Sequence, residues 1–193
     1  MIVFFGGFLG SGRKSIARRY AARYGFHYYD IDNERLHRFV RDKKGRTKER
    51  PVAARGDKAL MQLYEKVAAR LPLLVKMHQG VVIDHAFHRD APRKYLFAEA
   101  RKLSNDVALV WIQSEEQYVL KRLQLLEKRK MIRSVADALR GRALTKKYFQ
   151  LFRPAPAVFK RAGYRREELA ELRTLIQKQV SQESIGDKEV LKS

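Results

Sequence analysis

Three glycines and a following polar triplet near the amino terminus have the spacing of a phosphate-binding loop. The segment Gly6-Gly7-Phe8-Leu9-Gly10-Ser11-Gly12-Arg13-Lys14-Ser15 follows an apolar run over residues 2–5 and precedes a helical pattern over residues 16–24. Glycines permit left-handed backbone, and the amides of such a loop, together with the N-terminus of the next helix, attract an anion. An ordinary strand-to-helix turn is the alternative, which the flanking pattern disfavours. We therefore predict that Gly7, Gly10, Ser11 and Gly12 bind nucleotide phosphates.

The residues after Gly12 leave two alignments with the loop consensus G-x-x-x-x-G-K-[ST] open, in which lysine contacts the β and γ phosphates and the hydroxyl ligates Mg²⁺. Aligning Gly7 and Gly12 with the fixed glycines puts Arg13 at the lysine position and Lys14 at the hydroxyl position. If the loop carries one extra residue, Lys14 and Ser15 take these roles instead. Arginine still holds a phosphate, but lysine cannot ligate Mg²⁺. The first alignment therefore keeps nucleotide binding and weakens catalysis.

Three aspartates come at the ends of predicted strands. Asp30 and Asp32 follow the strand pattern over residues 26–29, and Asp84 ends the apolar run over residues 80–83. Because ligands of open α/β sheets bind at the carboxyl ends of the strands, these carboxylates are expected at the ligand crevice. We predict Asp30, Asp84 and Ser15 as Mg²⁺ residues and Asp32 as the base that accepts a hydroxyl proton. A turn that merely caps the following segment is the alternative for the Asp30 and Asp32 pair.

Basic residues dominate the chain and gather in two segments. Forty-two lysines and arginines against 21 acidic residues give a formal net charge of +21, which favours an acidic partner such as RNA or DNA. A generally basic set of solvated surfaces is the alternative. Residues 34–66 are predicted to form a broken, mobile helical arm, and a helical pattern with one apolar stripe returns over residues 58–70. Residues 121–153 are predicted to form a basic helical lid. From the lid, Arg122, Arg129 and Arg133 are predicted to close over a transferred phosphoryl group, although each also fits a solvated helix face.

Length and periodicity predict one α/β domain over residues 1–180, with about five parallel strands flanked by helices, and a polar, frayed tail over residues 181–193. The chain has no cysteine and no apolar run of about 20 residues, so a soluble protein of a reducing, cytoplasm-like compartment is expected, without a membrane partner. His85 and His88 lack a nearby third ligand and are predicted to form hydrogen bonds rather than a metal site.

The order of these parts resembles the P-loop kinases of the nucleoside-monophosphate-kinase group. The glycine loop followed by Asp30-Ile31-Asp32 looks like shikimate kinase, while residues 82–89 and 122–129 look more like the polynucleotide kinase and zeta-toxin branch. The resemblance covers roughly residues 1–135. It implies ATP and Mg²⁺ as cofactors, Asp30 at the metal and Asp32 at the acceptor hydroxyl, with Arg35 and Arg89 as substrate contacts.

Together these features predict an ATP-dependent phosphotransferase that acts on a hydroxyl acceptor, with a polynucleotide 5′ end favoured by the charge. Two other interpretations stay open. One is a small-metabolite kinase of the shikimate or gluconate type, and the other is a catalytically silent protein that binds nucleotide and nucleic acid. The sequence leaves the oligomeric state unspecified.

Overall fold

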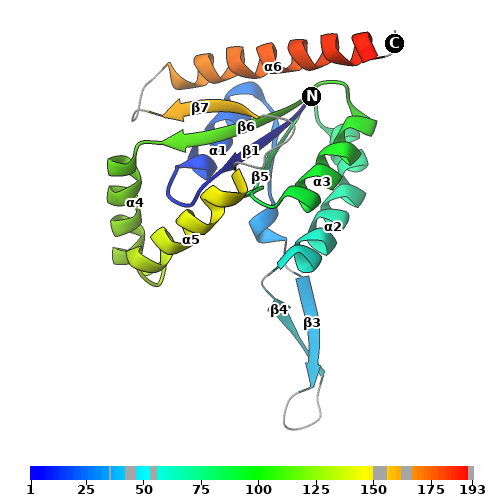
Figure 1. Ribbon diagram of the computed structural model, residues 1–193. Helices are drawn as coiled ribbons and strands as arrows, with labels where there is room; N and C mark the ends of the chain where they lie inside the picture. Colours follow the sequence, from blue (N-terminus) through cyan, green and yellow to red (C-terminus); the bar gives the residue numbers. More distant parts are fainter. Residues whose placement is uncertain (35, 42–46, 53–55, 150–155, 162–166, 191–193) are drawn as a thin grey trace.

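A five-stranded parallel sheet forms the centre of the computed structural model, with helices on both faces (Figure 1). The structure describes residues 1–34, 36–41, 47–52, 56–149, 156–161 and 167–190. Parallel pairing joins the strands in the order β2-β5-β1-β6-β7. The strands of this sheet are β1 (Ile2–Gly7), β2 (His27–Asp30), β5 (Val81–Asp84), β6 (Val107–Ser114) and β7 (Ala157–Arg161). The predicted fold class, an α/β sandwich on five parallel strands, is confirmed.

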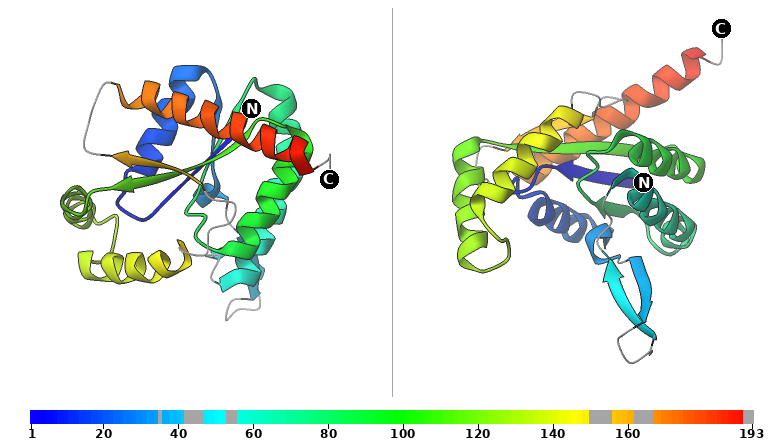
Figure 2. Two further views of the ribbon diagram at one scale, coloured as in Figure 1. Left: turned by 45° about the horizontal axis from the view of Figure 1, so that its top comes forward. Right: turned by 60° about the horizontal axis from the view of Figure 1, so that its bottom comes forward.

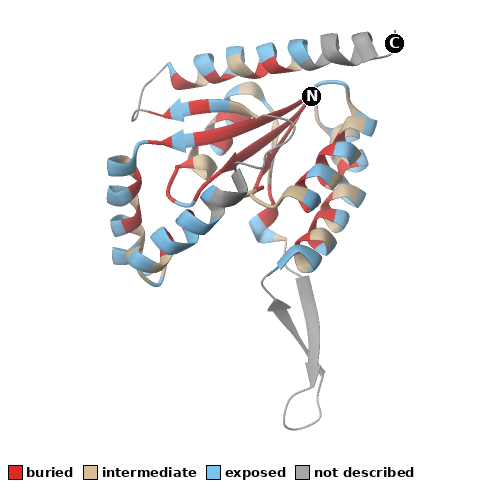
Figure 3. Ribbon diagram, viewed as in Figure 1, coloured by how far each residue is buried: buried red, intermediate tan, exposed pale blue. Residues whose placement is uncertain are grey.

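Alternate residues of the central strand β1 face two separate hydrophobic layers. Ile2 and Phe4 belong to the cluster that includes α2 (Gly56–Met77) and α3 (Asp90–Leu103). Val3 and Phe5 belong to the cluster that includes α1 (Arg13–Tyr24) and α6 (Glu168–Val190). Each of these four side chains is at most 1% exposed. A parallel sheet covered on both faces requires strands that are apolar throughout, and the runs in β1, β5 and β6 meet this requirement. Figure 3 shows the resulting buried centre of the sheet.

Most helices lie where the apolar periodicity places them, with bounds that differ by a few residues. Helix α2 continues past Pro72, seven residues beyond the predicted end at residue 70, and helix α6 continues to Val190. The frayed tail predicted from residue 181 is therefore wrong as far as Val190. The α-helices are α1 (Arg13–Tyr24), α2 (Gly56–Met77), α3 (Asp90–Leu103), α4 (Glu116–Lys128), α5 (Val135–Phe149) and α6 (Glu168–Val190).

The segment between β2 and α2 differs from its predicted structure. Strands β3 (Leu36–Arg41) and β4 (Thr47–Val52) pair antiparallel into a hairpin that extends away from the sheet (Figures 1 and 2). The predicted broken helix is wrong for residues 36–41 and 47–52, because Pro51 lies within a strand and does not mark a helix break. The predicted helix over residues 58–70 is confirmed within α2.

Helices α4 and α5 form the part predicted as a lid. They lie beyond the carboxyl ends of β1 and β6 (Figure 1) and pack on each other through Val119, Leu123 and Ala138. This cluster is separate from the two layers that cover the sheet. Within the described part of the chain, none of the helices has the length and hydropathy needed to span a membrane.

Candidate active site

The glycine loop joins β1 to α1 and adopts the backbone that its sequence predicts. Gly10 and Gly12 have φ values of 83° and 80°, in the left-handed region that favours glycine, and Gly12 caps α1. Strand β6, which pairs with β1, holds the loop, because the Ser114 hydroxyl donates to the Ser11 carbonyl oxygen at 2.7 Å. The loop and the first residues of α1 line one pocket, as a phosphate site at a helix N-terminus requires.

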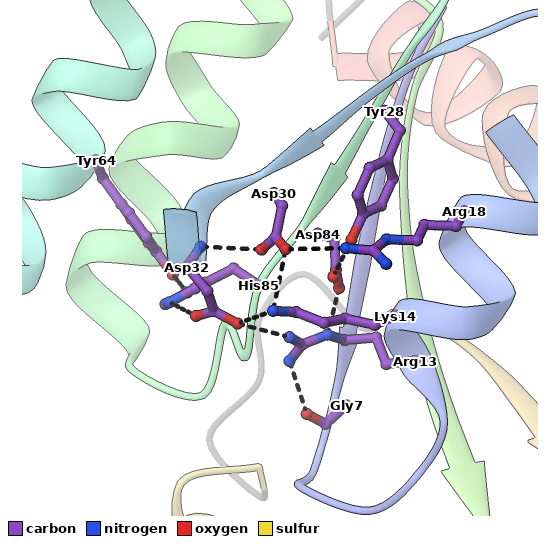
Figure 4. Close-up of polar contacts among 10 residues, drawn as sticks. All are labelled: Gly7, Arg13, Lys14, Arg18, Tyr28, Asp30, Asp32, Tyr64, Asp84 and His85. Carbon is purple, nitrogen blue, oxygen red and sulfur yellow. Dashed lines mark hydrogen bonds and ion pairs between the residues drawn. The ribbon is translucent and has the colours of Figure 1, made fainter. Parts of the chain in front are cut away.

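Both basic residues after Gly12 turn toward carboxylates at the ends of the neighbouring strands (Figure 4). Arg13 begins α1, and its guanidinium pairs with Asp84, donates to the Gly7 carbonyl at 3.3 Å and lies 3.4 Å from Asp32. The Lys14 ammonium lies 3.0 Å from one oxygen of Asp30 and 3.0 Å from Oδ2 of Asp32. The structure thus brings both cations to the same cluster, in which Arg13 spans the loop and Lys14 bridges two aspartates.

Asp30 and Asp84 are register partners at the carboxyl ends of β2 and β5, so the sheet itself places their carboxylates together. Asp84 is fully buried and accepts a hydrogen bond from the Tyr28 hydroxyl at 2.7 Å. Asp30 accepts from the Asp32 amide at 3.1 Å and thereby starts the 3-10 turn η1 (Ile31–Asn33). Asp32 lies in this turn, beyond the end of β2, and its side chain is 44% exposed. Of the three aspartates, Asp32 has the accessibility that a base needs.

The surroundings move the protonation equilibria of these groups in different directions. Burial raises the pKa of Asp84, and the charge of Arg13 and the Tyr28 hydroxyl only partly offset this effect. Burial also acts to raise the pKa of Asp32, but His85, Arg13 and Lys14 outweigh it, so the pKa of Asp32 is lowered. The pKa of Lys14 is raised, because its bonds to Asp32 and Asp30 exceed the opposing effect of burial. At neutral pH the accessible part of the cluster is therefore an ionised carboxylate beside a lysine cation.

A pocket of about 340 Å³ lies over the loop, within the size range of small-ligand sites. Arg122 of α4 reaches into it and donates to the Ser15 hydroxyl at 3.1 Å. The walls of the pocket come from the glycine loop, from Asp32 and from the region of α4 and α5. The lining residues are Phe8, Leu9, Gly10, Ser11, Gly12, Arg13, Lys14, Asp32, Arg122, Leu126, Met131 and Ile132.

Three further predicted arginines that the structure describes lie outside this pocket. Arg129 and Arg133 are exposed in the connection between α4 and α5 and do not line the pocket. Arg89 precedes α3 and pairs with Asp57 at 3.5 Å. Arg35 lies outside the described residues. In this structure, Arg122 is thus the predicted lid arginine that meets the loop.

Four side chains around the site were not predicted to be catalytic or ligand-binding, although His85 was predicted to form hydrogen bonds. Tyr64 and His85 form a buried hydrogen-bonded pair that reaches Asp32. Arg142 of α5 is buried, donates to the Leu9 carbonyl at 3.2 Å and lies over the Phe8 ring. Arg161, at the end of β7, is fully buried and lies against Gly12. The position of Arg161 after the apolar residues of β7 was the available sequence signal, because charged residues at strand ends face the ligand crevice.

The residues present fit a nucleotide better than they fit a metal ion held by protein alone. The loop offers left-handed amides and the cations Arg13, Lys14 and Arg122, which suit phosphate oxygens. Among the described residues no group of three or more His, Cys, Asp or Glu side chains could hold a metal ion. Where Mg²⁺ binds together with nucleotide phosphates, it needs only one or two protein carboxylates besides phosphates and waters. Asp30 and Asp84 are carboxylates of this kind. Ser15, the third predicted metal residue, is engaged by Arg122.

Comparison with known proteins bears on the fold. The sequence matches no protein-family model and no curated protein. A shikimate kinase from Acinetobacter baumannii, solved with shikimate, is 15% identical with a TM-score of 0.56 over 94% of this chain and 93% of its own. A gluconokinase from Sinorhizobium meliloti 1021 is 16% identical with a TM-score of 0.56, covering 100% and 96%. The YorR protein from Bacillus subtilis, in complex with phosphorylated GDP, is 9% identical with a TM-score of 0.54, covering 92% and 96%.

These similarities extend over nearly the whole of each chain, and their sequence identity is low. They therefore establish the architecture and leave the chemistry to be argued from the residues of this chain. The glycine loop, the parallel sheet and the helices on both faces make the protein an α/β sandwich of the P-loop NTPase type.

Proposed function

We propose that the protein is an ATP-dependent phosphotransferase in which Asp32 receives the proton of an acceptor hydroxyl. The observation that carries this proposal is the position of Asp32, a half-exposed carboxylate in the wall of the pocket over the glycine loop, beside the loop cations. A base must lie within hydrogen-bond reach of the hydroxyl it serves, and a hydroxyl bound in this pocket meets that condition.

The chain's own residues divide the remaining tasks. The loop amides, with Arg13 and Lys14, would bind the β and γ phosphates, and Arg122 would balance charge on the transferred group from the α4 side. Asp30 and Asp84 would hold Mg²⁺, which supplies charge neutralisation on the phosphates when bound. The binding of phosphates would draw Arg13 and Lys14 away from the carboxylates they now contact.

A small hydroxylated metabolite is the first candidate acceptor. The pocket of about 340 Å³ suits a small ligand, and the names of the similar structures include shikimate kinase and gluconokinase. A coupled assay of ADP release with shikimate, gluconate and a panel of other hydroxylated acids tests this proposal. Turnover that falls by about 10² to 10⁴ in Asp32→Asn, with ATP affinity kept, is the expected result.

A polynucleotide 5′ end is the second candidate, favoured by the net charge of +21. The hairpin that follows η1 supplies a specific observation, because its register places Arg38 directly opposite Arg50. A polyanion would be attracted to two arginines that share one register position of the hairpin. Transfer of labelled phosphate from ATP to a 5′-hydroxyl oligonucleotide would support this acceptor over the metabolite.

Two results separate these proposals from the silent alternative. Calorimetry that detects no ATP binding at millimolar concentration, with or without Mg²⁺, would remove the phosphotransferase altogether. ATP binding without turnover on metabolites, oligonucleotides or water would leave a nucleotide-binding protein that lacks catalysis.

A further inference from the structure

A buried line of polar groups connects the hydrophobic core to Asp32 (Figure 4). The hydroxyl of Tyr64, on α2, lies 2.6 Å from Nδ1 of His85, the residue after β5. Nε2 of the same imidazole lies 3.3 Å from Oδ1 of Asp32. Tyr64 is 0% exposed and His85 is 8% exposed, so solvent does not satisfy either group. The contacts therefore run from α2 through the residue after β5 to one carboxylate oxygen of Asp32.

Aromatic packing gives the imidazole one orientation. The His85 ring meets Tyr64 and Phe87 edge to face, with centroid distances of 5.4 Å and 5.6 Å. Phe87 has a φ of 49°, which is a costly backbone conformation for a bulky residue. This conformation turns the Phe87 ring back into the core beside His85, where it is 1% exposed. The surrounding fold therefore stabilises a strained backbone at Phe87, and the Phe87 side chain covers the His85 ring.

The partners of the imidazole determine its tautomer. The ionised carboxylate of Asp32 can only accept, so Nε2 must carry a proton to form this contact. In a neutral imidazole Nδ1 is then the acceptor, and the Tyr64 hydroxyl is its donor. Burial raises the pKa of Tyr64, which keeps the hydroxyl protonated for this purpose.

The two oxygens of Asp32 thus have different partners. Oδ1 contacts His85, whereas Oδ2 contacts Lys14 and Arg13 of the loop. If phosphates draw the loop cations away, the His85 contact is the one of these three that remains. We propose that His85, held in its Nε2–H tautomer by Tyr64, is a positioning residue that fixes Asp32 from the core and keeps Oδ2 turned toward the glycine loop. This inference rests on the proposed function of Asp32.

The first test reads the tautomer and needs no substrate. Long-range ¹H–¹⁵N correlation spectra of the five histidines, with His85 assigned through His85→Gln, should show His85 as the Nε2–H tautomer. Tyr64→Phe should shift His85 toward a tautomer mixture. The control Tyr24→Phe removes a tyrosine hydrogen bond of 3.2 Å to the Leu169 carbonyl and should leave His85 unchanged. An Nδ1–H tautomer in the wild type overturns the proposal, whereas an unchanged tautomer in Tyr64→Phe removes Tyr64 from it and leaves Asp32 as the group that sets the tautomer.

The second test measures hydrolysis of Mg-ATP with water as the acceptor. His85→Ala should lower kcat by about 10-fold to 100-fold and leave the KM for ATP within about twofold, the pattern of a misplaced catalytic group. His85→Gln keeps an N–H donor near the Nε2 position and should recover part of the loss. His78→Ala, which removes a ring stacked on His27, is the control. Unchanged kcat in His85→Ala refutes the positioning role.

The two tests distinguish an error in the proposed function from an error in the positioning role of His85. If the wild-type protein does not hydrolyse ATP or transfer phosphate, the proposed function is wrong, whatever tautomer His85 has. If it does turn over, and His85→Ala and His85→Gln lose the same activity and the same thermal stability, His85 is a structural residue and Asp32 is oriented by the loop.

Discussion

Gly12 is the residue of the glycine loop at which a larger side chain has least room. A Cβ built there lies 2.0 Å from Nη1 of the buried Arg161, on a backbone with φ of 80°. We expect Gly12→Ala to abolish ATP binding in calorimetry and to lower the free energy of unfolding in urea. Gly25→Ala is the matched control, since Gly25 has φ of 68° and no neighbour within 4 Å. In both variants the left-handed backbone at the new alanine should lower the free energy of unfolding by about 1 kcal/mol. A further decrease in Gly12→Ala alone would report the displacement of Arg161.

Arg13 and Lys14 should differ in what their removal costs. Arg13 is 12% exposed and pairs with the fully buried Asp84, so Arg13→Ala leaves a buried carboxyl without its cation and should cost about 3 kcal/mol in urea. Lys14 is 40% exposed, so Lys14→Ala should cost less than about 1 kcal/mol and act mainly on ATP affinity.

A double-mutant cycle checks the cause of the Arg13 effect. Asp84→Asn in the Arg13→Ala background should restore part of the lost stability, because the unpaired charge is gone. Additive losses in the two single variants would mean that the pair contributes nothing to folding.

His88 should make stability depend on pH. Burial and the charge of Arg89 lower the pKa of His88 to about 4, below the ordinary value of 6.5. Between these pH values the unfolded chain binds the proton that the folded protein excludes, so the free energy of unfolding falls as the pH falls from about 6.5 to about 4. We expect a loss of more than about 1 kcal/mol over this range in urea titrations. His88→Gln should flatten the dependence, and an equal slope in both proteins would assign it to other groups.

The residue types of the site were predictable, but their contacts were only partly so. Asp30, Asp32 and Asp84 could be placed together because the ends of parallel strands share one edge of a sheet. Tyr64 looked like an ordinary member of the apolar stripe of α2, and nothing local in the sequence indicates that its hydroxyl meets His85, 21 residues further on. A contact of this kind depends on how α2 packs on the sheet.

Helix α4 contributes Arg122 to the pocket, whereas Arg129 at its end lies outside the pocket. Arg122→Ala should lower turnover by about 10³-fold if Arg122 balances charge on the transferred group. Arg129, at the end of the same helix, is exposed and does not line the pocket, so Arg129→Ala is the matched control. Equal losses in both variants, measured by steady-state kinetics, would indicate that α4 and α5 close further over the loop during turnover.

The elements that the sequence predicted well are those with a periodic apolar face. Strands β1, β5 and β6 are continuous apolar runs, and α1, α2 and α3 carry stripes that the sheet covers. The sequence of β3 and β4 carries no such pattern, because charged residues interrupt its apolar residues. Hydrophobic periodicity therefore gave no signal for these strands, and the loop-like composition was misread as a broken helix.

The net charge of +21 predicts that the protein binds polyanions with an affinity that depends on the salt concentration. We expect a labelled single-stranded oligonucleotide to bind with a log-log slope of about −0.7 for each contacted phosphate. Arg38→Ser with Arg50→Ser should reduce this slope. Arg23→Ser with Lys178→Ser, on α1 and α6, removes the same charge and is the control. Equal effects in the two double variants would show that attraction is general and not localised to the hairpin.

The packing beneath the glycine loop also has a practical consequence. Trp111 is the single tryptophan of the chain, is 1% exposed on β6 and meets the Phe8 ring edge to face at 4.9 Å. Phe8 belongs to the loop and lines the pocket, so a ligand that moves the loop changes the surroundings of the indole. The intrinsic fluorescence of the unlabelled protein should therefore report occupancy of the site, and a stopped-flow trace at one emission wavelength would give the rates of nucleotide arrival and departure.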